Sequence, residues 1–176
     1  MKKQGNSSGR FPHKKTIEQN IVFDSKMESE YFLKCQQEVR EGEILKFERQ
    51  VEFVLQEKFE IVNGKKYYEK DFSSKYKFDK FRKDNNGTLC LPIKYIADFV
   101  KYYKDGRVVV VDTKGKSSTD FEIKRKLFMF QHPEMEFQVL TLYKGQWQDY
   151  YEVNKIKNAN KRLRKAKKAA KDKKVE

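Results

Sequence analysis

The most informative stretch of the chain is VVVVDTKGK, residues 108–116. Four consecutive valines are typical of a strand that is buried on both faces, yet the run ends in Asp112 and Lys114, with only Thr113 between them. Because side chains alternate along a strand, Asp112 and Lys114 lie on the same face. Either the strand simply reaches water at this point, or the two charges belong to a metal-dependent active site.

A second acid, Asp98, interrupts the apolar stretch YIADFV, residues 95–100. If the following hairpin loop has three residues, with Gly106 in its left-handed position, Asp98 lies opposite Asp112, whereas a two-residue turn would send Asp98 to the other face. Opposite Cβ atoms are then about 5 Å apart, so the two carboxylates can share one Mg²⁺ or Mn²⁺ ion. The structural alternative is an ion pair of Asp98 with Lys94 or Lys114.

Each residue of this arrangement has a predicted role. Asp98 and Asp112 are the metal ligands, with the carbonyl oxygen of Thr113 as a further ligand. The ion would lower the pKa of a bound water and neutralise a phosphate. Lys114 would orient or activate that water and stabilise developing negative charge.

The fourth candidate catalytic residue is Glu28, which lies near the start of a helix predicted within residues 22–43. Asp24 or Ser25 can cap this helix, and Ser25-x-x-Glu28 fits a capping box. From this position Glu28 could complete the ligand shell of the metal or bind a second ion. The alternative is that Glu28 only caps the helix as the partner of Ser25.

The middle of the chain is predicted to be rich in strands. Residues 51–62 alternate in strand fashion and lead into a hairpin turn at Asn63-Gly64. Residues 65–92 form an elaborated β-rich insertion in this prediction. Their aromatic side chains alternate with lysines, which suits packing on the core and also stacking on bases beside phosphate contacts.

A second helix is predicted over residues 120–131, opened by Thr119-x-x-Glu122 and ended by Pro133. Its predicted inward side chains are Ile123, Leu127 and Phe130. The helix would connect the valine strand to a parallel strand over residues 137–142 by a right-handed crossover. The predicted fold class is therefore α/β, with a mixed sheet flanked by helices.

The net charge of +14 is concentrated in the tails. Residues 1–15 have five Lys or Arg and no acid, and residues 155–176 have eleven against two, so the part between them is neutral. We therefore predict a flexible basic arm (1–19), a core domain (20–153) and a Lys/Arg-rich tail that can be helical (154–176). Such tails suit a polyanion, and nucleic acid fits them better than a membrane because the tail lacks a large apolar face. The tail residues predicted to bind nucleic acid are Lys161, Arg162, Arg164, Lys165, Lys167 and Lys168.

Several classes of protein are disfavoured. Cys35 and Cys90 form no C-x-x-C pair, and with two histidines they make no convincing zinc site. Neither an apolar signal region nor a run of about 20 apolar residues is present, so we expect no membrane association. The expected location is the cytoplasm, that of the bacterial host if a phage encodes the protein.

Taken together, Glu28, Asp98 and VVVDTKG (109–115) before an amphipathic helix resemble the PD-(D/E)XK nuclease superfamily. Within it, the chain is similar to small phage- and prophage-encoded nuclease-like proteins related to Holliday-junction resolvases. Three segments carry that similarity: FDSKMESEYF (23–32), YIADFVKYYKDGRVVVVDTKG (95–115) and KRKLFMFQHPEMEFQVL (124–140). The resemblance covers about residues 20–142. Ala97 replaces the proline of the superfamily pattern, and Asp112 stands where Glu is more frequent.

The resemblance implies a restriction-endonuclease-like α-β-β-β-α-β core and metal-dependent hydrolysis of phosphodiester bonds. On this basis we expect a Mg²⁺-dependent (or Mn²⁺-dependent) DNA endonuclease, acting on branched recombination or replication intermediates. Lys124 and Lys126 of the second helix could reach backbone phosphates or form its solvated face. A homodimer would suit a resolvase, which needs two active sites. The alternative is a non-catalytic DNA- or RNA-binding protein with a relic nuclease fold.

Overall fold

The computed structural model describes residues 16–18 and 21–172. Most of the predicted N-terminal arm lies outside this range. Its described part, Thr16–Glu18, forms strand β1 and pairs with β2 (Ile21–Phe23) beside the first helix. None of the described helices is both long and apolar enough to cross a bilayer.

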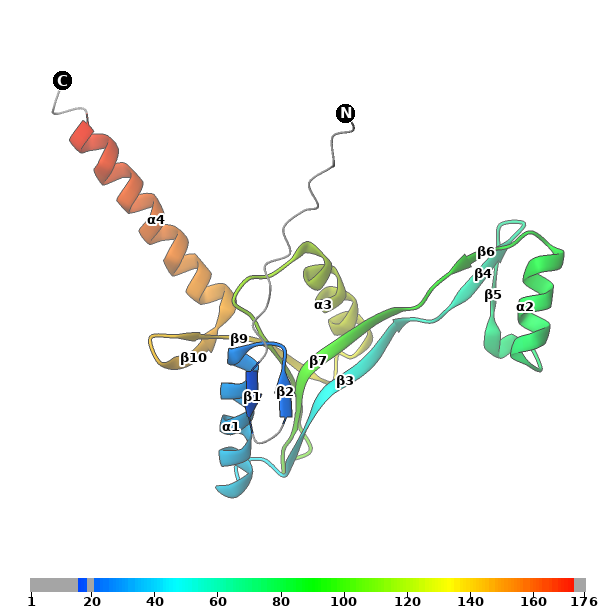
Figure 1. Ribbon diagram of the computed structural model, residues 1–176, viewed down its shortest axis with the longest axis horizontal. Coiled ribbons are helices and arrows are strands. Elements are labelled where there is room, and N and C mark those ends of the chain that lie inside the picture. The colour runs from blue at the N-terminus through cyan, green and yellow to red at the C-terminus, as the bar shows by residue number, and fades with distance from the viewer. Residues whose placement is uncertain (1–15, 19–20, 173–176) are drawn as a thin grey trace, which may run out of the picture.

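The centre of the protein is a mixed five-stranded sheet with the order β10-β9-β8-β7-β3 (Figure 1). Only β8 and β9 are parallel, and helix α3 (Thr119–Gln131) connects them. The strands are β3 (Lys46–Gln56), β7 (Ile93–Tyr102), β8 (Val108–Thr113), β9 (Glu136–Tyr143) and β10 (Gln146–Asp149). The predicted α/β class, a mixed sheet flanked by helices, is confirmed.

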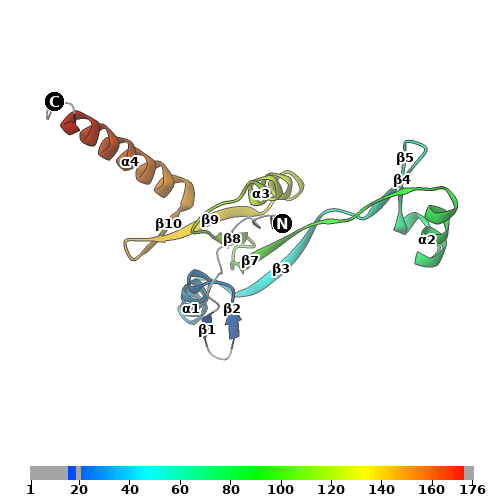
Figure 2. The same ribbon diagram turned by 45° about the horizontal axis from the view of Figure 1, so that its top comes forward.

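Helices cover both faces of the sheet, as the turned view of Figure 2 shows. Helix α1 (Lys26–Arg40) packs Tyr31 and Phe32 against one face, where Val109 and Val111 lie. Helix α3 packs on the other face. There Phe128 and Val110 share a second buried cluster. The four valines of β8 thus serve two cores, which is why the run is apolar throughout.

The predicted hairpin register is confirmed. Phe99 pairs with Val111, and the loop is closed by a bond from the Tyr103 N–H to the Arg107 carbonyl (3.0 Å), which leaves residues 104–106 as the loop. Gly106 has a φ of 86°, the left-handed conformation that this loop needs.

Along both β3 and β7, the inward-facing side chains switch from one face of the sheet to the other, and the two switches lie side by side. On β7, Ala97 belongs to the core under α3, while Phe99, two residues on, belongs to the core under α1. On β3 the change falls at Gln50, whose φ is 51°, and residue pairing is interrupted there between Arg49↔Phe99 and the next pair. Such an irregularity redirects side chains locally, and it places Asp98 at the point of the change.

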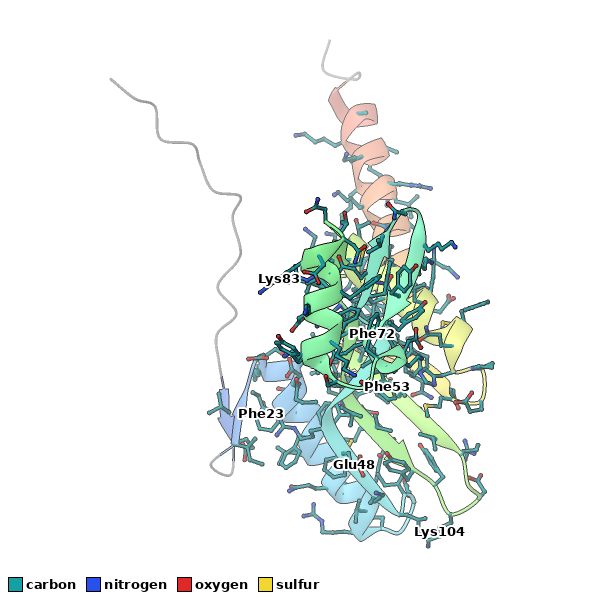
Figure 3. All side chains as sticks on the ribbon, turned by 90° about the vertical axis from the view of Figure 1, so that its right-hand side faces the viewer. Phe23, Glu48, Phe53, Phe72, Lys83 and Lys104 are labelled. Atoms are coloured by element: carbon teal, nitrogen blue, oxygen red, sulfur yellow. The ribbon has the colours of Figure 1, made fainter. Side chains whose placement is uncertain are left out.

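Beyond the sheet, β3 and β7 continue as a two-stranded ribbon that carries a small lobe, residues 57–92 (Figure 1). In Figure 3 the lobe faces the viewer, with Phe72 and Lys83 labelled. Phe78 is fully buried there, and its ring contacts that of Phe72. The lobe contains β4 (Phe59–Val62), β5 (Lys65–Tyr68), the 3-10 helix Glu69–Asp71, α2 (Lys75–Asp84) and β6 (Thr88–Cys90). Strands β5 and β6 lie within the predicted insertion (65–92), but its longest element is helix α2, so the prediction of a β-rich segment is corrected there.

Two details of α3 differ from the prediction. Ser118, not Thr119, caps the helix by accepting a bond from the N–H of Phe121 (3.2 Å). Ile123 and Phe130, predicted to face inward, are 55% and 85% exposed. The buried stripe instead runs through Phe121 and Phe128, seven residues apart, because the sheet lies beneath that side of the helix.

The C-terminal tail is helical. Helix α4 (Tyr150–Asp172) begins at β10 and extends away from the sheet (Figure 1). Tyr150 and Val153 are buried against the core, and the side chains described beyond Ile156 are exposed.

Candidate active site

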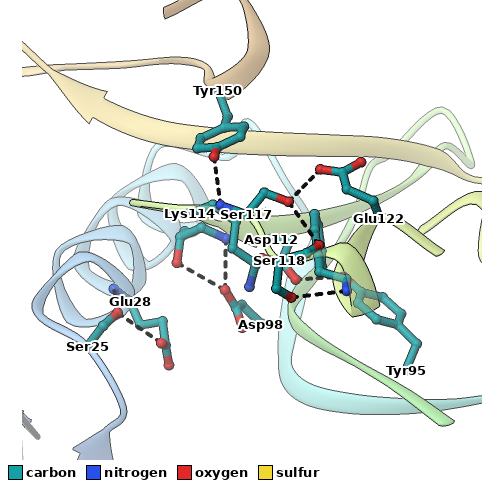
Figure 4. Close-up of polar contacts among 12 residues, drawn as sticks. Ser25, Glu28, Tyr95, Asp98, Asp112, Lys114, Ser117, Ser118, Glu122 and Tyr150 are labelled. Atoms are coloured by element: carbon teal, nitrogen blue, oxygen red, sulfur yellow. Dashed lines mark hydrogen bonds and ion pairs between the residues drawn. The ribbon is translucent and has the colours of Figure 1, made fainter. Parts of the chain in front are cut away.

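Asp112 lies at the end of β8, where the strand leaves the core, and is only 1% exposed. The Tyr95 hydroxyl donates a hydrogen bond to its Oδ2 (3.0 Å), and the Lys114 ammonium forms an ion pair with its Oδ1 (Figure 4). Lys114 also lies over the ring of Phe121, with Nζ 4.7 Å from the centroid. The two residues predicted from the sequence are thus in direct contact.

Asp98 is tied to the same strand end. Its Oδ2 accepts two hydrogen bonds from Thr113, one from the backbone N–H (2.8 Å) and one from the hydroxyl (3.0 Å). Backbone pairing between β7 and β8 stops at Phe99 and Val111, and the Asp98 side chain bridges the strands where they part. Thr113 therefore acts as a hydrogen-bond donor that orients the Asp98 side chain. The sequence did not predict this role.

Glu28 approaches from the first turn of α1 and is almost fully buried. The Ser25 hydroxyl accepts a bond from the Glu28 N–H (3.1 Å) and donates one to Glu28 Oε1 (2.9 Å). Burial and the negative charge of Asp98 raise the pKa of Glu28. Glu28 thus takes part in the helix cap and is also electrostatically coupled to Asp98, while its role as a metal ligand stays a prediction.

The charged groups of the site change one another's pKa values. Burial raises the pKa of Asp112 to about 7, and Asp98 adds to the rise, although Lys114 and Tyr95 oppose it. For Lys114, burial works against the charge, but Asp112, Asp98 and Glu28 outweigh it and raise the pKa. Three neighbouring carboxylates, of which Asp112 and Glu28 are buried and have raised pKa values, form a site that additional positive charge would stabilise.

The residues suit Mg²⁺ or Mn²⁺ by chemistry, because such ions prefer carboxylate oxygens. As described, residues 16–18 and 21–172 contain no group of three His, Cys, Asp or Glu side chains arranged to hold a metal. Lys114 pairs with Asp112, and Thr113 holds Asp98. In the structure these contacts occupy Oδ1 of Asp112 and Oδ2 of Asp98.

A second polar network supports the loop that follows Lys114. Glu122 accepts hydrogen bonds from the hydroxyls of Ser117 (2.5 Å) and Tyr151 (2.9 Å to each oxygen), and Arg125 pairs with it (3.2 Å). The Tyr150 hydroxyl accepts a bond from the Ser117 N–H (2.6 Å; Figure 4). These contacts fasten the site loop to both α3 and the root of α4.

Two residues of the site were missed by the sequence analysis. Tyr95 reaches Asp112 from β7, and nothing in its sequence position distinguishes it from a core aromatic. Arg49, on β3, lies within electrostatic reach of Glu28 and Asp98. Its signal was available, since a charged residue occupies an inward position between Phe47 and Val51 in an alternating strand.

The predicted nucleic-acid contacts fall on two helices. On α3, Lys124 pairs with Asp120 (3.1 Å), while Lys126 is exposed and forms no ion pair with any described residue. On α4, no acid occurs between Glu152 and Asp172. Beside Tyr143 this helix lines a groove of about 520 Å³ with Lys157, Asn160, Lys161, Arg164, Lys165 and Lys168. The predicted Arg162 and Lys167 are exposed but do not line it.

Comparison with known proteins yields one finding. A family model described as "Protein of unknown function (DUF1064)" matches residues 8–146. No curated protein and no solved structure matches the chain significantly.

Proposed function

We propose that this chain, which belongs to the DUF1064 family, is a metal-dependent nuclease of the PD-(D/E)XK type that acts on DNA. One observation carries the proposal. Asp98, Asp112 and Lys114 meet at the end of β8, and Glu28 joins them electrostatically from α1. The order of elements around the main sheet, α1-β3-β7-β8-α3-β9, supports it because it repeats the α-β-β-β-α-β core expected from the resemblance.

Asp98, Asp112 and Glu28 would hold Mg²⁺ or Mn²⁺. When bound, the ion supplies a water of lowered pKa and positive charge for a phosphate oxygen. Tyr95 fixes the orientation of Asp112 through its hydroxyl, and Thr113 does the same for Asp98. Lys114 keeps its charge because the acids raise its pKa, so its ammonium can donate hydrogen bonds to a developing oxyanion.

DNA is the proposed substrate because the charge of the molecule favours a polyanion. The groove of α4 offers five lysines or arginines beside Tyr143, and Lys126 is free to contact a phosphate. We further propose that the DNA substrate is branched, because the chain resembles proteins related to Holliday-junction resolvases. A homodimer would serve such a substrate.

A second candidate is a DNA-binding protein without catalysis. It is favoured by the ion pair of Asp112 with Lys114 and by the two bonds from Thr113 to Asp98, which satisfy these acids without an ion. In that case the basic groove of α4 would supply the function, and the acids would matter only for stability.

The test is incubation of the full-length protein with labelled four-way junction, flap and linear duplex DNA, in Mg²⁺, Mn²⁺ or EDTA. The Asp112→Asn and Lys114→Ala variants are compared with Asp84→Asn, which removes an exposed acid of the lobe. Cleavage that requires the metal and is lost in the first two variants only supports the nuclease. Binding without cleavage under every metal supports the second candidate.

A further inference from the structure

Arg49 has no polar partner in the described part of the protein. Its guanidinium stacks over Phe23, with Cζ 4.0 Å from the ring centroid, and lies 5.4 Å from that of Phe32. Its Nε–H is buried and donates to no acceptor, and no carboxylate of the described residues forms an ion pair within 4.0 Å of its nitrogens. A partly buried cation without a partner is costly unless a ligand provides one.

A second arginine shows the contrast. Arg107 also stacks on an aromatic ring, with Cζ 4.5 Å from the centroid of Tyr103, but its Nε is paired with Asp105 at 2.7 Å. Stacking fixes the plane of both guanidinium groups. Arg107 has its anion within the chain, whereas Arg49 lacks one.

The position of Arg49 relates it to the candidate active site. It precedes Gln50, where β3 changes faces at the level of Asp98, so its side chain lies on the α1 side of the sheet. Glu28, Asp98 and Asp24 act on it electrostatically, although burial has the larger effect and lowers its pKa. Lys114 lies over Phe121 on the α3 side, forms an ion pair with Asp112 and interacts electrostatically with Asp98 and Glu28. Glu28 and Asp98 therefore lie within electrostatic reach of both cations.

We propose that Arg49 binds a phosphate of the DNA strand next to the acidic cluster. The proposal rests on the nuclease function proposed above and adds a substrate-binding residue to it. A guanidinium with its plane fixed by two rings can offer two parallel N–H donors to the non-bridging oxygens of a phosphodiester, the geometry in which arginine binds phosphate best. The DNA backbone would then cross the acids with Arg49 on one side and Lys114 on the other.

A binding experiment in EDTA tests the contact without requiring cleavage. Fluorescence anisotropy measures the affinity of the full-length protein for DNA in which single phosphates are replaced, one at a time, by uncharged methylphosphonates. Wild type, Arg49→Met, Arg49→Lys and the control Arg107→Met are compared, and thermal melting checks that each is folded. At the phosphate that Arg49 contacts, we expect the wild type and Arg107→Met to lose roughly tenfold in affinity. Arg49→Met should bind unmodified DNA roughly tenfold more weakly and lose nothing further at that phosphate.

Arg49→Lys keeps the charge but not the two-pronged contact, so its loss at that phosphate should be intermediate. If Arg49→Met does not fold, Arg49→Lys decides: a loss equal to that of the wild type overturns the proposal, and a smaller one supports it. The proposal is also overturned if Arg49→Met is as sensitive as the wild type at every phosphate, while the nuclease proposal stands. Absence of any DNA binding by the wild type would refute both.

Discussion

Asp112 in the core and Glu60 in the lobe are both buried acids whose pKa values are raised by burial. Asp112 receives a hydrogen bond from Tyr95 and an ion pair from Lys114. Both oxygens of Glu60 are buried without a hydrogen-bond partner, and its nearest cation, the Arg82 Nε, is 3.8 Å away.

The surroundings of these two carboxylates distinguish a candidate functional site from a buried acid that only destabilises the fold. Burial alone raises the pKa of a carboxyl group, so a raised pKa does not mark function by itself. What distinguishes Asp112 is convergence, because two other acids and a lysine share its surroundings. Glu60 is influenced by Arg82, Lys58 and a single acid, Asp79, but none of these donates a hydrogen bond to it. It lies beside Gly87, where an added Cβ would be 2.5 Å from its Oε1.

Glu38 is a third buried acid, and it forms ion pairs with two lysines. Its carboxylate forms ion pairs with Lys101 and Lys34, both at 2.6 Å, and these cations hold its pKa low against the effect of burial. Lys101→Met leaves Glu38 with only the more exposed Lys34, and should lower the free energy of unfolding by about 3 kcal/mol. Denaturant unfolding measures the loss. The double variant Glu38→Met/Lys101→Met should recover much of it, and a double variant as unstable as the single one would contradict this account.

Thr113→Val tests the core side of the comparison. Valine has nearly the shape of threonine but removes the hydroxyl that donates to Asp98, while the backbone N–H bond remains. Because hydrogen bonds to charged groups are worth roughly 1.5–3 kcal/mol, we expect DNA cleavage to fall about tenfold. Single-turnover rates measure this, with Thr141→Val as a control for a buried threonine elsewhere. An unchanged rate would remove Thr113 from the positioning of Asp98.

Gly87→Ala tests the lobe side. The new methyl group would press on Glu60, and we expect the lobe to lose about 1 kcal/mol of local stability without any effect on the core. Hydrogen exchange of amides in residues 57–92 reports the loss, with the sheet as internal reference. The double variant Glu60→Ala/Gly87→Ala should not show the added strain. Equal destabilisation of the sheet would mean that lobe and core unfold together.

The smallest expected effect is the pH dependence of the lobe. Because the pKa of Glu60 is raised in the folded state, the folded lobe binds its proton more tightly than the unfolded chain does. The stability of the lobe should therefore fall as the pH rises from the ordinary glutamate range through the raised pKa. Glu60→Gln should remove this dependence and slow exchange in the lobe a few-fold at pH 8. Identical pH profiles for variant and wild type would show that Glu60 titrates normally.

Local rules in the sequence anticipated much of the fold and part of the site. The even spacing of Asp98 and Asp112 and the glycine of their loop gave the correct register, and Ser25 capped α1 as predicted. The turn at Asn63-Gly64 also formed, with positive φ at both residues. In each case the determining contacts lie within a few residues, so pattern and turn chemistry suffice.

Features that depend on packing between distant elements were missed. The inward face of α3 is set by where the sheet lies, so Phe130 is exposed although its spacing suited a core. The change of faces at Gln50 has no sequence signal, because glutamine is not a residue that favours positive φ. Tyr95 joined the site only through this local geometry, whereas the alternating pattern around Arg49 already marked that residue as unusual.

Mn²⁺ binding measured by electron paramagnetic resonance decides whether the acids of the core, and not those of the lobe, hold a metal ion. Wild type, Asp112→Asn and Glu60→Gln are titrated side by side. We expect wild type and Glu60→Gln to bind Mn²⁺ equally and Asp112→Asn to bind it at least about tenfold more weakly. Equal binding by all three proteins, or none by the wild type, would contradict this expectation.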